Sequence, residues 1–362
     1  MEKILIVNIG SSSKRYALYQ DKELFNIHIY SFKDEFILEY EDDKLKINEL
    51  EYKNSLKLFI SRFLSNLNEI KAIGIRVVCP GKYFLYNKLI DYKYIRKLED
   101  MKDILPLHII PVLEEIKNIK KLFPKIKLIG ISDSSFHKTI SEEARHYAIG
   151  KKEAEKYGIH RYGYHGISVR SVLDKSKNFI KAKKIIVCHI GSGVSLTAIE
   201  NYKSLDNSMG FTPLEGIFGG TRVGDIDPGA VIYLSKKLNL EEYFNHKCGF
   251  SGLTGKSDIR ELLNNKFALN LFSYKIKKYI GSYVAALNGL DLIIFTGAVG
   301  ENSSKIRELI CKGLDNLGID LDKKKNSSVK EGFVHSSNSK VKVLVLKTNE
   351  MEEIYKESLK FI

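Results

Sequence analysis

Short apolar blocks alternate with helix-like stretches along this chain, which predicts an α/β protein. Continuous apolar runs are typical of strands buried on both faces, whereas apolar residues three and four apart indicate amphipathic helices. The runs predict strands at 4–8, 16–19, 74–78, 126–131, 185–190, 291–296 and 341–346. The helical spacing predicts helices at 56–67, 112–123, 306–317 and 350–359. Pro124 and Gly318 are expected to end the second and third of these helices.

The length and an internal similarity favour two related domains. A chain of 362 residues is longer than one typical hydrophobic core needs. Residues 4–13 align with residues 185–194, so the second segment begins half the chain after the first. Each segment is an apolar strand, a Gly-Ser turn and a second strand. Two short matches of a common pattern can arise by chance, but their places near the start of each half favour a duplicated domain.

Several features indicate a soluble protein of the cytoplasm. The most apolar stretch, 281–300, contains Asp291 and several glycines, so we interpret it as a buried helix followed by a core strand. The apolar run in residues 1–8 is too short for a signal peptide and continues into a strand. The four cysteines form no Cys-x-x-Cys pair, which predicts free thiols in a reducing compartment rather than a disulfide framework or zinc site.

Composition adds one feature that needs explaining, a formal net charge of +14 with a pI near 9.3. Hydrophobic residues at 44% and charged residues at 28% are ordinary for a globular protein. The basic excess raises nucleic acid or an anionic membrane as partners. However, 48 of the 58 basic residues are lysines spread over almost every segment, which favours a solvated surface. With only 10 arginines, an arginine inside a glycine-rich motif is a candidate functional residue.

Three small-residue turns, at 10–13, 191–193 and 297–302, are candidate phosphate sites. Such turns let backbone N–H groups approach an anion, and the third follows a core strand and precedes a helix. None is a Walker A loop, because no Gly-Lys-Ser/Thr follows. Each turn alone is more simply a structural turn, but the three together favour a nucleotide site.

The segment 211–228 carries the most specific chemistry. It combines glycines with Arg222, whose planar fork suits phosphoryl oxygens. The structural alternative is a capped turn in which Asp225 pairs with Arg222. The histidine of Arg-Tyr-Gly-Tyr-His-Gly, His165, is a second candidate, and the alternative there is a buried core histidine. The motifs around His108 and His137 are individually weak for the same reason.

The motifs taken in order resemble acetate kinase over nearly the whole chain, from Asn8 to Glu350. The most specific are Ser-Met-Gly-Phe-Thr-Pro-Leu-Glu-Gly at 208–216 and Gly-Thr-Arg-x-Gly-Asp-Ile-Asp-Pro at 220–228. The others are Asn-x-Gly-Ser-Ser-Ser, Arg-Val-Val, Pro-Leu-His, Asp-x-x-Phe-His, Arg-Tyr-Gly-Tyr-His-Gly, His-x-Gly-x-Gly-x-Ser, Gly-Glu-Asn-Ser and Thr-Asn-Glu.

The resemblance implies two duplicated actin-like ATPase domains of ribonuclease H-like α/β fold, with a cleft between them. The expected domains are residues 1–138 plus 353–362, on the acyl side, and residues 139–352, on the nucleotide side. The implied reaction is reversible transfer of the ATP γ-phosphoryl group to the carboxylate of a short-chain fatty acid, acetate first. A carboxylate is already ionised at pH 7, so such a site needs cations and hydrogen-bond donors more than a base.

The resemblance also implies the catalytic residues. Arg76 would orient the substrate carboxylate, Arg222 would bind the phosphoryl group in flight, and His165 would donate to the transition state. Asp133 matches an essential carboxylate that holds an arginine or helps to place the metal. The metal is Mg²⁺ or Mn²⁺, with ATP and ADP as co-substrates, and a homodimer is expected.

The other implied site residues fall into three groups. The acyl pocket would comprise Val78, Leu107, His108, Tyr164 and Pro213, together with Arg76. The nucleotide side would comprise Ser11, Ser13, Arg15, His189, Gly191, Ser192, Gly193, Asp258, Arg260, Ala298, Val299, Gly300 and Asn302. The metal would lie near Asn8 and Glu350.

Four departures from the family pattern concern affinity and specificity more than reaction class. Arg15 replaces a lysine, Ser192 and Ile109 each replace an asparagine, and Tyr164 replaces the usual phenylalanine. The four catalytic candidates remain in place. The departures at Arg15, Ser192 and Ile109 motivate one alternative, a non-catalytic nucleotide-binding homologue.

Two further alternatives are a polyol or sugar kinase and a nucleic-acid-binding protein. A sugar kinase would need Asp133 as a base and a polar pocket, whereas Val78 and Leu107 are apolar. Nucleic-acid binding rests on charge alone, without a recognisable motif. The expected partners are therefore a short-chain carboxylate and ATP, not nucleic acid or a membrane.

Overall fold

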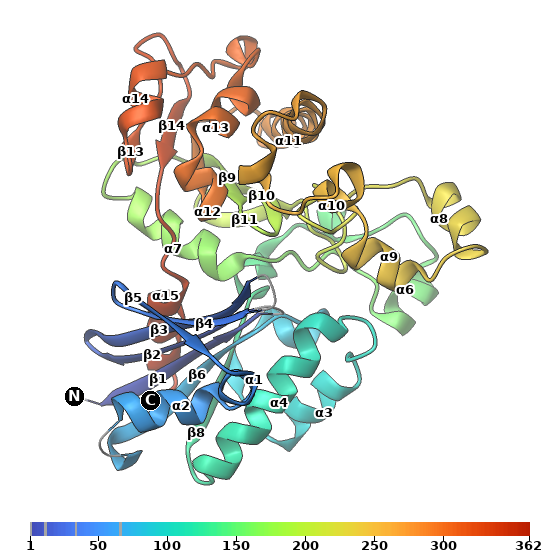
Figure 1. The fold of residues 1–362 in the computed structure, drawn as a ribbon. Helices are drawn as coiled ribbons and strands as arrows, with labels where there is room; N and C mark the ends of the chain where they lie inside the picture. Colours follow the sequence, from blue (N-terminus) through green and yellow to red (C-terminus); the bar gives the residue numbers. More distant parts are fainter. Residues whose placement is uncertain (1, 11–12, 33–34, 65–66) are drawn as a thin grey trace. The chain divides into compact units, whose positions relative to one another are not determined.

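The computed structural model describes residues 2–10, 13–32, 35–64 and 67–362 (Figure 1). The chain divides into two compact units. Unit 1 comprises Met1–Ser135 and Asn349–Ile362, and unit 2 comprises Phe136–Thr348. The boundaries expected from the sequence lay at 138/139 and 352/353, so residues 136–138 and 349–352 fall in the other unit. This shift moves Glu350 into unit 1.

Unit 1 is built on an eight-stranded mixed sheet. Its strands are β1 (Lys3–Ile9), β2 (Ser13–Gln20), β3 (Lys22–Phe32), β4 (Glu35–Tyr40), β5 (Asp43–Ile47), β6 (Ile70–Val77), β7 (Lys88–Leu89) and β8 (Lys127–Ser132). They pair in the order β5-β4-β3-β2-β1-β6-β8-β7. The central strands β1, β6 and β8 are parallel, and the flanking strands pair antiparallel. The parallel strands are continuous apolar runs because helices cover both of their faces.

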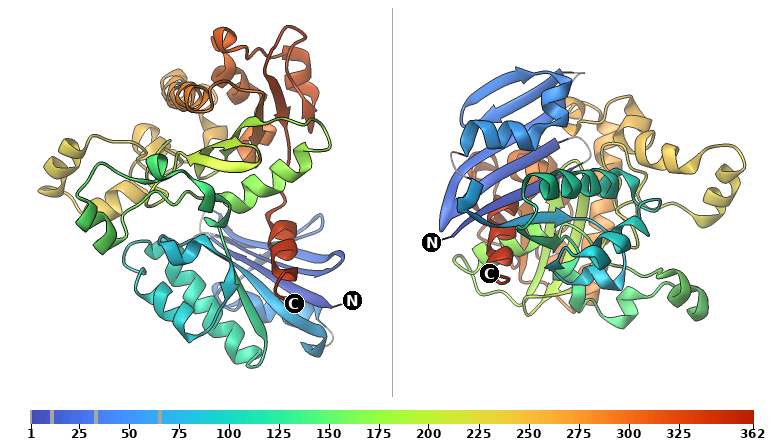
Figure 2. Two further views of the ribbon diagram at one scale, coloured as in Figure 1. Left: turned by 180° about the vertical axis from the view of Figure 1, so that it is seen from behind. Right: turned by 90° about the horizontal axis from the view of Figure 1, so that it is seen from below.

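The helices of unit 1 lie on both faces of this sheet (Figures 1 and 2). They are α1 (Glu49–Lys53), α2 (Ser55–Phe63), α3 (Tyr92–Glu99), α4 (Pro106–Leu122) and α15 (Glu350–Leu359). Helices α2 and α4 cover one face, and the C-terminal helix α15 covers the other. A Cβ added at Gly74 would lie 2.2 Å from Ser358 Oγ, so only glycine lets α15 approach β6 this closely. Helix α15 has the bounds predicted from the sequence.

Unit 2 is built on a six-stranded sheet. Its strands are β9 (Lys184–Ile190), β10 (Val194–Glu200), β11 (Lys203–Asn207), β12 (Leu292–Thr296), β13 (Gly332–Phe333) and β14 (Lys342–Val345). They pair in the order β11-β10-β9-β12-β14-β13, with β9, β12 and β14 parallel. Alternate residues of β9 point to two separate cores: Cys188 packs in the core that includes Phe272, and Val187 in the core that includes Val172.

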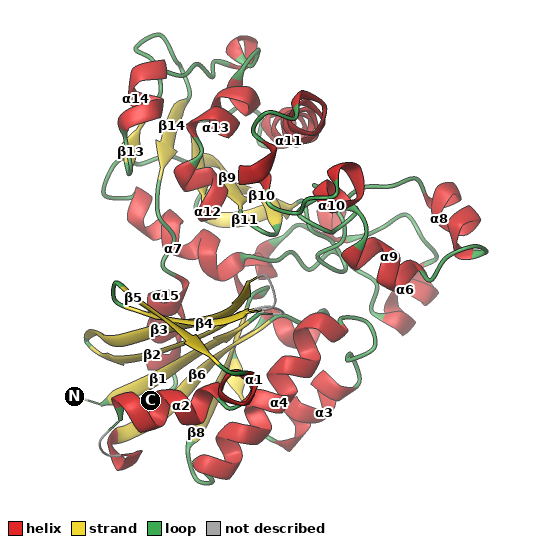
Figure 3. Ribbon diagram, in the orientation of Figure 1, coloured by secondary structure: helices red, strands yellow, loops and turns green. Residues whose placement is uncertain are grey.

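The helices of unit 2 cover both faces of its sheet or lie in the segments that extend from it (Figure 3). They are α5 (Glu142–Arg145), α6 (Lys151–Tyr157), α7 (Gly166–Ser176), α8 (Pro228–Ser235), α9 (Leu240–His246), α10 (Gly249–Thr254), α11 (Lys266–Ala286), α12 (Gly297–Asn302), α13 (Ser304–Cys311) and α14 (Lys323–Ser328). Helix α7 supplies the core on one face, and α11 with α13 supplies the core on the other.

The internal similarity in the sequence corresponds to a repeated sheet. The order β3-β2-β1-β6-β8-β7 in unit 1 matches β11-β10-β9-β12-β14-β13 in unit 2, strand by strand and in every direction of pairing. Strand β1 begins at Lys3 and β9 at Lys184, which reproduces the alignment of Ile4 with Ile185 seen in the sequence. The prediction of a duplicated α/β fold is confirmed.

Several predicted elements differ in the structure. The helix predicted over 56–67 ends at Phe63, and the helix predicted over 112–123 already begins at Pro106. The helix predicted over 306–317 ends at Cys311, because Gly313 adopts φ +76° and breaks the helical path; a short 3₁₀ turn, Asp315–Leu317, follows. The glycine-rich segment 297–302, predicted as a turn, is itself the short helix α12.

The predictions about membrane spans and thiols can also be compared. Among the described residues, we find no helix with the length and apolar character required to cross a bilayer. All four cysteines are free thiols, as predicted, and Cys79, Cys188 and Cys311 are buried.

Candidate active site

Three candidate residues of unit 1 come from the carboxyl ends of adjacent parallel strands. Asn8 lies near the end of β1, Arg76 near the end of β6, and Asp133 directly after β8. The register pairs Val7 with Ile75 and Arg76 with Ile131, which aligns these ends. In open α/β sheets, ligands bind outside the carboxyl ends of the strands.

Arg76 and Asp133 form a buried two-point ion pair. Arg76 Nε donates to Asp133 Oδ1 over 3.2 Å, and Nη2 donates to Oδ2 over 3.1 Å. The Asp133 side chain is 1% exposed and the Arg76 side chain 17%. A buried carboxylate requires such a partner, and the two parallel hydrogen bonds determine the orientation of the guanidinium. Burial by itself would lower the pKa of Arg76, but the charges of Asp133 and Glu350 raise it above its usual value, so the group stays charged.

The third nitrogen of Arg76, Nη1, faces two further candidates. It donates to Asn8 Oδ1 over 3.4 Å and lies 3.6 Å from Glu350 Oε2. Asn8 Nδ2 in turn donates to Glu350 Oε2 over 3.0 Å. Glu350 is the first residue of α15, where a negative charge interacts favourably with the helix dipole. Four predicted site residues therefore form one polar cluster in unit 1.

The neighbouring strand β2 carries the predicted nucleotide residues of unit 1. Arg15 is exposed and lies directly opposite Asn8 in the β1–β2 ladder, so the two side chains share a face. Arg15 also faces His28 on β3. Burial and the charge of Arg15 lower the pKa of His28 to about 4. Ser13 accepts a hydrogen bond from Gly10 N–H at its carbonyl. Ser11 lies outside the described residues.

The acyl-pocket candidates divide between the units. In unit 1, Val78 is buried just after β6, and Leu107 and His108 are half-buried in the first turn of α4. In unit 2, Tyr164 and Pro213 are buried. The Tyr164 hydroxyl donates to the Phe211 carbonyl over 2.6 Å, so the tyrosine that replaces the usual phenylalanine fastens the loop containing Pro213.

In unit 2, several candidate site residues lie close to the turn 191–193 between β9 and β10. A Cβ added at Gly193 would lie 3.1 Å from His165 Nε2 and 3.6 Å from Arg222 Nη1. A Cβ added at Gly191 would lie 3.6 Å from His189 Nε2 and 4.0 Å from the Ala298 nitrogen. The two glycines thus allow both histidines, the guanidinium and the start of α12 to approach one stretch of backbone.

Serine hydroxyls orient the two histidines. His165 Nδ1 lies 2.9 Å from Ser195 Oγ, and His189 Nδ1 lies 2.8 Å from Ser168 Oγ. The ring centroids are 4.1 Å apart. His165 also adopts φ +59° as the N-cap of α7, an uncommon conformation for a residue with a side chain. Sequence reasoning missed these serines, although Ser195 ends a quoted motif and Ser168 lies two residues after another, because a serine in a strand or helix has no special spacing.

The carboxylates of the segment 211–228 have structural roles. Asp225 accepts from Gly216 N–H over 2.8 Å and from the Tyr279 hydroxyl over 2.7 Å. Asp227 caps α8 by accepting from Ala230 N–H. These bonds hold the glycine-rich loop that carries Arg222.

Arg161 and Tyr147 fasten the other motif, 208–216. Arg161 donates to Glu215 Oε1 over 2.5 Å and to the Asn207 carbonyl over 2.8 Å. The Tyr147 hydroxyl also donates to Glu215 and accepts from Phe211 N–H. Sequence reasoning did not assign either residue a role, because the partners come from distant parts of the chain.

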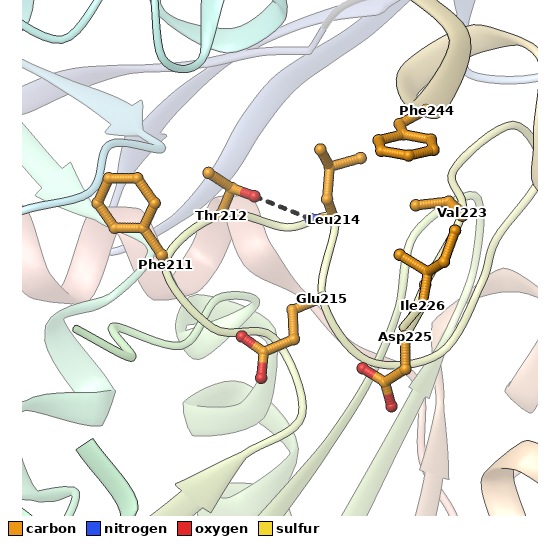
Figure 4. Close-up of a pocket in the computed structure, with 9 residues that line it drawn as sticks. Phe211, Thr212, Leu214, Glu215, Val223, Asp225, Ile226 and Phe244 are labelled. Carbon is orange, nitrogen blue, oxygen red and sulfur yellow. Dashed lines mark hydrogen bonds between the residues drawn. The ribbon is translucent and has the colours of Figure 1, made fainter. Parts of the chain in front are cut away.

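A groove of about 470 Å³ separates these two motifs (Figure 4). Leu214 and Glu215 line it from one loop, Val223 and Asp225 from the other, and Phe244 from α9. Its two carboxylates would repel an anionic substrate, and both already hold neighbouring groups. The groove is therefore a poor candidate for the acyl or phosphate site.

The remaining nucleotide candidates lie at the surface of unit 2 or in α12. Asp258 and Arg260 pair with one another, and the Arg260 side chain is 80% exposed. The hydrogen bonds from Arg260 lower the pKa of Asp258. Ser257, next to this pair, lies against Gly220 of the Arg222 loop. In α12, Ala298 and Asn302 are exposed, whereas Val299 and Gly300 are buried. Ser192 lies in the turn 191–193, where its carbonyl accepts from Gly220 N–H.

These features define a class of protein, the acetate and propionate kinase fold. The structure superimposes on a crystal structure of acetate kinase from Porphyromonas gingivalis with a TM-score of 0.87 and 32% identity. It superimposes on a propionate kinase from Francisella tularensis with a TM-score of 0.90 and 33% identity. Both alignments cover 99% of each chain.

The sequence comparisons give the family. The model of the Acetokinase family matches residues 3–356. The curated acetate kinase of Thermoanaerobacterium thermosaccharolyticum is 37% identical over 99% of both chains. The chain belongs to the Acetokinase family, as the order of its motifs indicated.

Proposed function

We propose that this protein transfers the γ-phosphoryl group of ATP to the carboxylate of acetate, forming acetyl phosphate and ADP. The observation that carries the proposal is the end-to-end family match. Arg76, Asp133, His165 and Arg222 lie in the sequence motifs on which the resemblance rests. Propionate is the next candidate, because a similar solved structure is a propionate kinase.

In unit 1, Arg76 is the group that orients the acceptor carboxylate. Asp133 engages two of its nitrogens, Nε and Nη2. The third nitrogen, Nη1, carries two hydrogens and has only the long contacts with Asn8 and Glu350, so it is the nitrogen that we assign to a substrate oxygen. Asp133 is thus a positioning residue rather than a base. Its carboxylate is buried and accepts two hydrogen bonds from Arg76. This also argues against the sugar-kinase alternative, in which Asp133 would have to accept a proton from a hydroxyl group.

In unit 2, Arg222 and His165 stabilise the phosphoryl group during transfer. Phosphoryl transfer depends on positioning and on neutralising charge over the transferring oxygens. Ser195 engages Nδ1 of His165, and the other ring nitrogen, Nε2, lies beside Gly193 and the Arg222 guanidinium. An imidazole nitrogen and a guanidinium thus lie beside the turn that we propose holds the phosphates.

The residues near Asn8 suit the divalent metal that the family implies. The Asn8 amide and the carboxylates of Asp133 and Glu350 supply oxygen, the donor that Mg²⁺ prefers. Asn8 and Glu350 would hold the ion together with phosphate oxygens and water. When bound, Mg²⁺ would supply charge neutralisation to the ATP phosphates.

The direct test is an acyl phosphate trapping assay. Purified protein is given Mg-ATP with acetate, propionate or butyrate, and hydroxylamine converts any acyl phosphate to a coloured hydroxamate. We expect product with acetate and a graded response to chain length. ATP binding without hydroxamate from any of the three acids would instead support the non-catalytic alternative.

We also propose a cytoplasmic homodimer. The four free thiols support the compartment. Helix α8 supports self-association: none of its residues is buried, and Ile232 and Tyr233 are 63% and 62% exposed. Light scattering should give twice the chain mass, and Ile232→Glu should give a monomer. A monomeric wild-type protein would refute this part.

A further inference from the structure

Three potential metal ligands lie close together in unit 2, on the segment 142–161 that carries α5 and α6. His146, Glu155 and His160 each offer one ligand atom, and these atoms lie within 4.8 Å of one another. None of the three belongs to the catalytic candidates. We propose that they bind one divalent transition-metal ion of the Zn²⁺ type, at a structural site separate from the magnesium of the reaction.

The spacing fits tetrahedral coordination. With metal–ligand bonds of about 2.0–2.1 Å, two ligand atoms of a tetrahedral zinc site lie about 3.4 Å apart. His160 Nε2 and Glu155 Oε1 are already 3.6 Å apart. The His146 ring is close to the His160 ring, with centroids 4.9 Å apart and planes at 82°. Binding therefore requires only a small closure of exposed side chains.

A hydrogen bond of His146 leaves the nitrogen on the other side of its ring able to bind a metal. Its Nδ1 lies 2.8 Å from the Glu142 carbonyl oxygen, which can only accept, so Nδ1 carries the hydrogen. In the neutral ring the lone pair is then on Nε2. Metal-binding histidines typically donate their second ring N–H to a carbonyl or carboxylate in this way.

The three proposed ligands differ in burial: one is buried and two are exposed to solvent. The His160 side chain is 1% exposed, whereas His146 is 39% and Glu155 49% exposed. Gly158, in the left-handed conformation at φ +64°, ends α6 and turns the chain so that His160 returns beside His146. An ion can therefore enter from solvent and be held against a fixed imidazole.

The donor set selects the class of metal. Two imidazole nitrogens and one carboxylate suit Zn²⁺ and its transition-metal neighbours, whereas Mg²⁺ prefers oxygen and retains its water. A fourth position remains for water. The ion would link the end of α5, helix α6 and the residue before Arg161. Arg161 donates a hydrogen bond to Glu215, which belongs to the motif 208–216. A bound metal ion would therefore stabilise the position of this motif.

The test is a titration of the nucleotide-free protein with Co²⁺ and Zn²⁺, with Mg²⁺ in excess. We expect one equivalent of Co²⁺ with visible ligand-field absorption and no thiolate charge-transfer band, and a higher melting temperature with Zn²⁺. His146→Ala and Glu155→Gln should each weaken binding by at least about tenfold, the effect that even outer-shell changes produce. Both side chains are exposed, so the variants should fold.

Two matched controls complete the experiment. His246→Ala removes another exposed histidine, and Glu153→Gln removes another carboxylate from α6; both should bind like wild type. The proposal is overturned if binding is absent, if His146→Ala or Glu155→Gln binds as tightly as wild type, or if the Co²⁺ spectrum shows thiolate ligation. It is independent of the kinase proposal, because neither readout uses turnover.

Discussion

The two units share one strand arrangement but place different chemistry at the strand ends. The alignment that matches Lys3 with Lys184 also matches Asn8, near the end of β1, with His189, near the end of β9. The registers pair Ile75 with Val7 and Phe295 with Cys188, so the next residues, Arg76 and Thr296, also correspond. Unit 1 therefore has the charged guanidinium of Arg76 where unit 2 has the neutral hydroxyl of Thr296.

The third strand extends this difference. Gly130 pairs with Ile75 and Val345 with Phe295, so the residues three positions further on, Asp133 and Thr348, correspond. In unit 1, Asp133 binds Arg76. In unit 2, Glu301 of α12 accepts from the Thr296 hydroxyl over 3.2 Å and from Thr348 N–H over 3.1 Å.

The location of the basic side chains also separates the units. Unit 1 holds Arg76 within a strand, whereas unit 2 holds His165 at a helix N-cap and Arg222 on a glycine-rich loop. The repeated sheet thus supplies positions, and the residues at those positions decide the chemistry.

The largest expected effect is on the buried pair of unit 1. Asp133→Ala leaves the largely buried Arg76 guanidinium without the carboxylate that accepts two of its hydrogen bonds. We therefore expect a loss of about 3–5 kcal/mol in the free energy of unfolding. Arg260→Ala is the matched control, since it removes a two-point ion pair at the surface of unit 2 but keeps the hydrogen bond from the backbone of residue 260 to Asp258, and it should cost about 0–1 kcal/mol. Urea denaturation measures both. Equal losses would mean that burial does not distinguish the two pairs.

The next effect concerns the loop cation of unit 2. Arg222→Ala should lower kcat by about 10²–10³-fold, because a charge-assisted contact made in the transition state is lost. The fold should be unchanged. Arg96→Ala, which removes an exposed arginine of α3, is the control and should keep full hydroxamate production. Unchanged kcat in the Arg222 variant would remove this residue from the mechanism.

A smaller effect is expected for the hydroxyl that orients His165. Ser195→Ala removes one hydrogen bond, worth about 1 kcal/mol, so kcat should fall roughly fivefold with little change in KM for ATP. Ser235→Ala, which loses only a local bond in α8, should behave like wild type. A Ser195 variant with wild-type kcat would show that His165 needs no such support.

The smallest effects are opposite pH dependences in the two units. Burial and Arg15 lower the pKa of His28 to about 4, whereas burial raises the pKa of Asp206 in unit 2 to about 6. As the pH falls from 6.5 to 4, the unfolded state takes up the His28 proton first, so this group destabilises the fold by about 1 kcal/mol after allowance for solvent screening. Asp206 has the opposite sign: the folded state binds its proton more tightly, so stability is lost as the pH rises through about 6.

Urea unfolding at pH 5 and pH 7 separates the two groups. Relative to wild type, His28→Gln should lose less stability on going to pH 5. Asp206→Asn should lose more, because it lacks the compensating proton uptake. Identical pH profiles in wild type and both variants would contradict the prediction.

The sequence predicted the central strands and the last helix because their apolar runs are continuous. It missed β3, β4 and β5. Strand β3 corresponds to β11 of unit 2, whereas β4 and β5 have no counterpart there. In β3, Ile27 and Ile29 are buried while His28 and Tyr30 between and beyond them are not, an alternation that identifies a half-buried strand. A search for period-two alternation would have found it.

The candidate residues were identifiable from motifs, but their partners were not. Arg76 and Asp133 are 57 residues apart in the chain, and Asn8 and Glu350 are 342 apart. The structural roles of Glu215 and Asp225 were also hidden, because their partners Arg161 and Tyr279 come from distant segments.

The sequence by itself determined the central strands, the repeat, the family and the residue types available for phosphoryl transfer, because these depend on local pattern and composition. Only the tertiary structure decided which nitrogens of Arg76 are engaged, which serine orients each histidine, and that His146, Glu155 and His160 converge. The reason is physical: parallel strands in register and a left-handed glycine bring residues together across long or reversed stretches of chain. Hydrogen bonds of about 3 Å act only after that approach has been made.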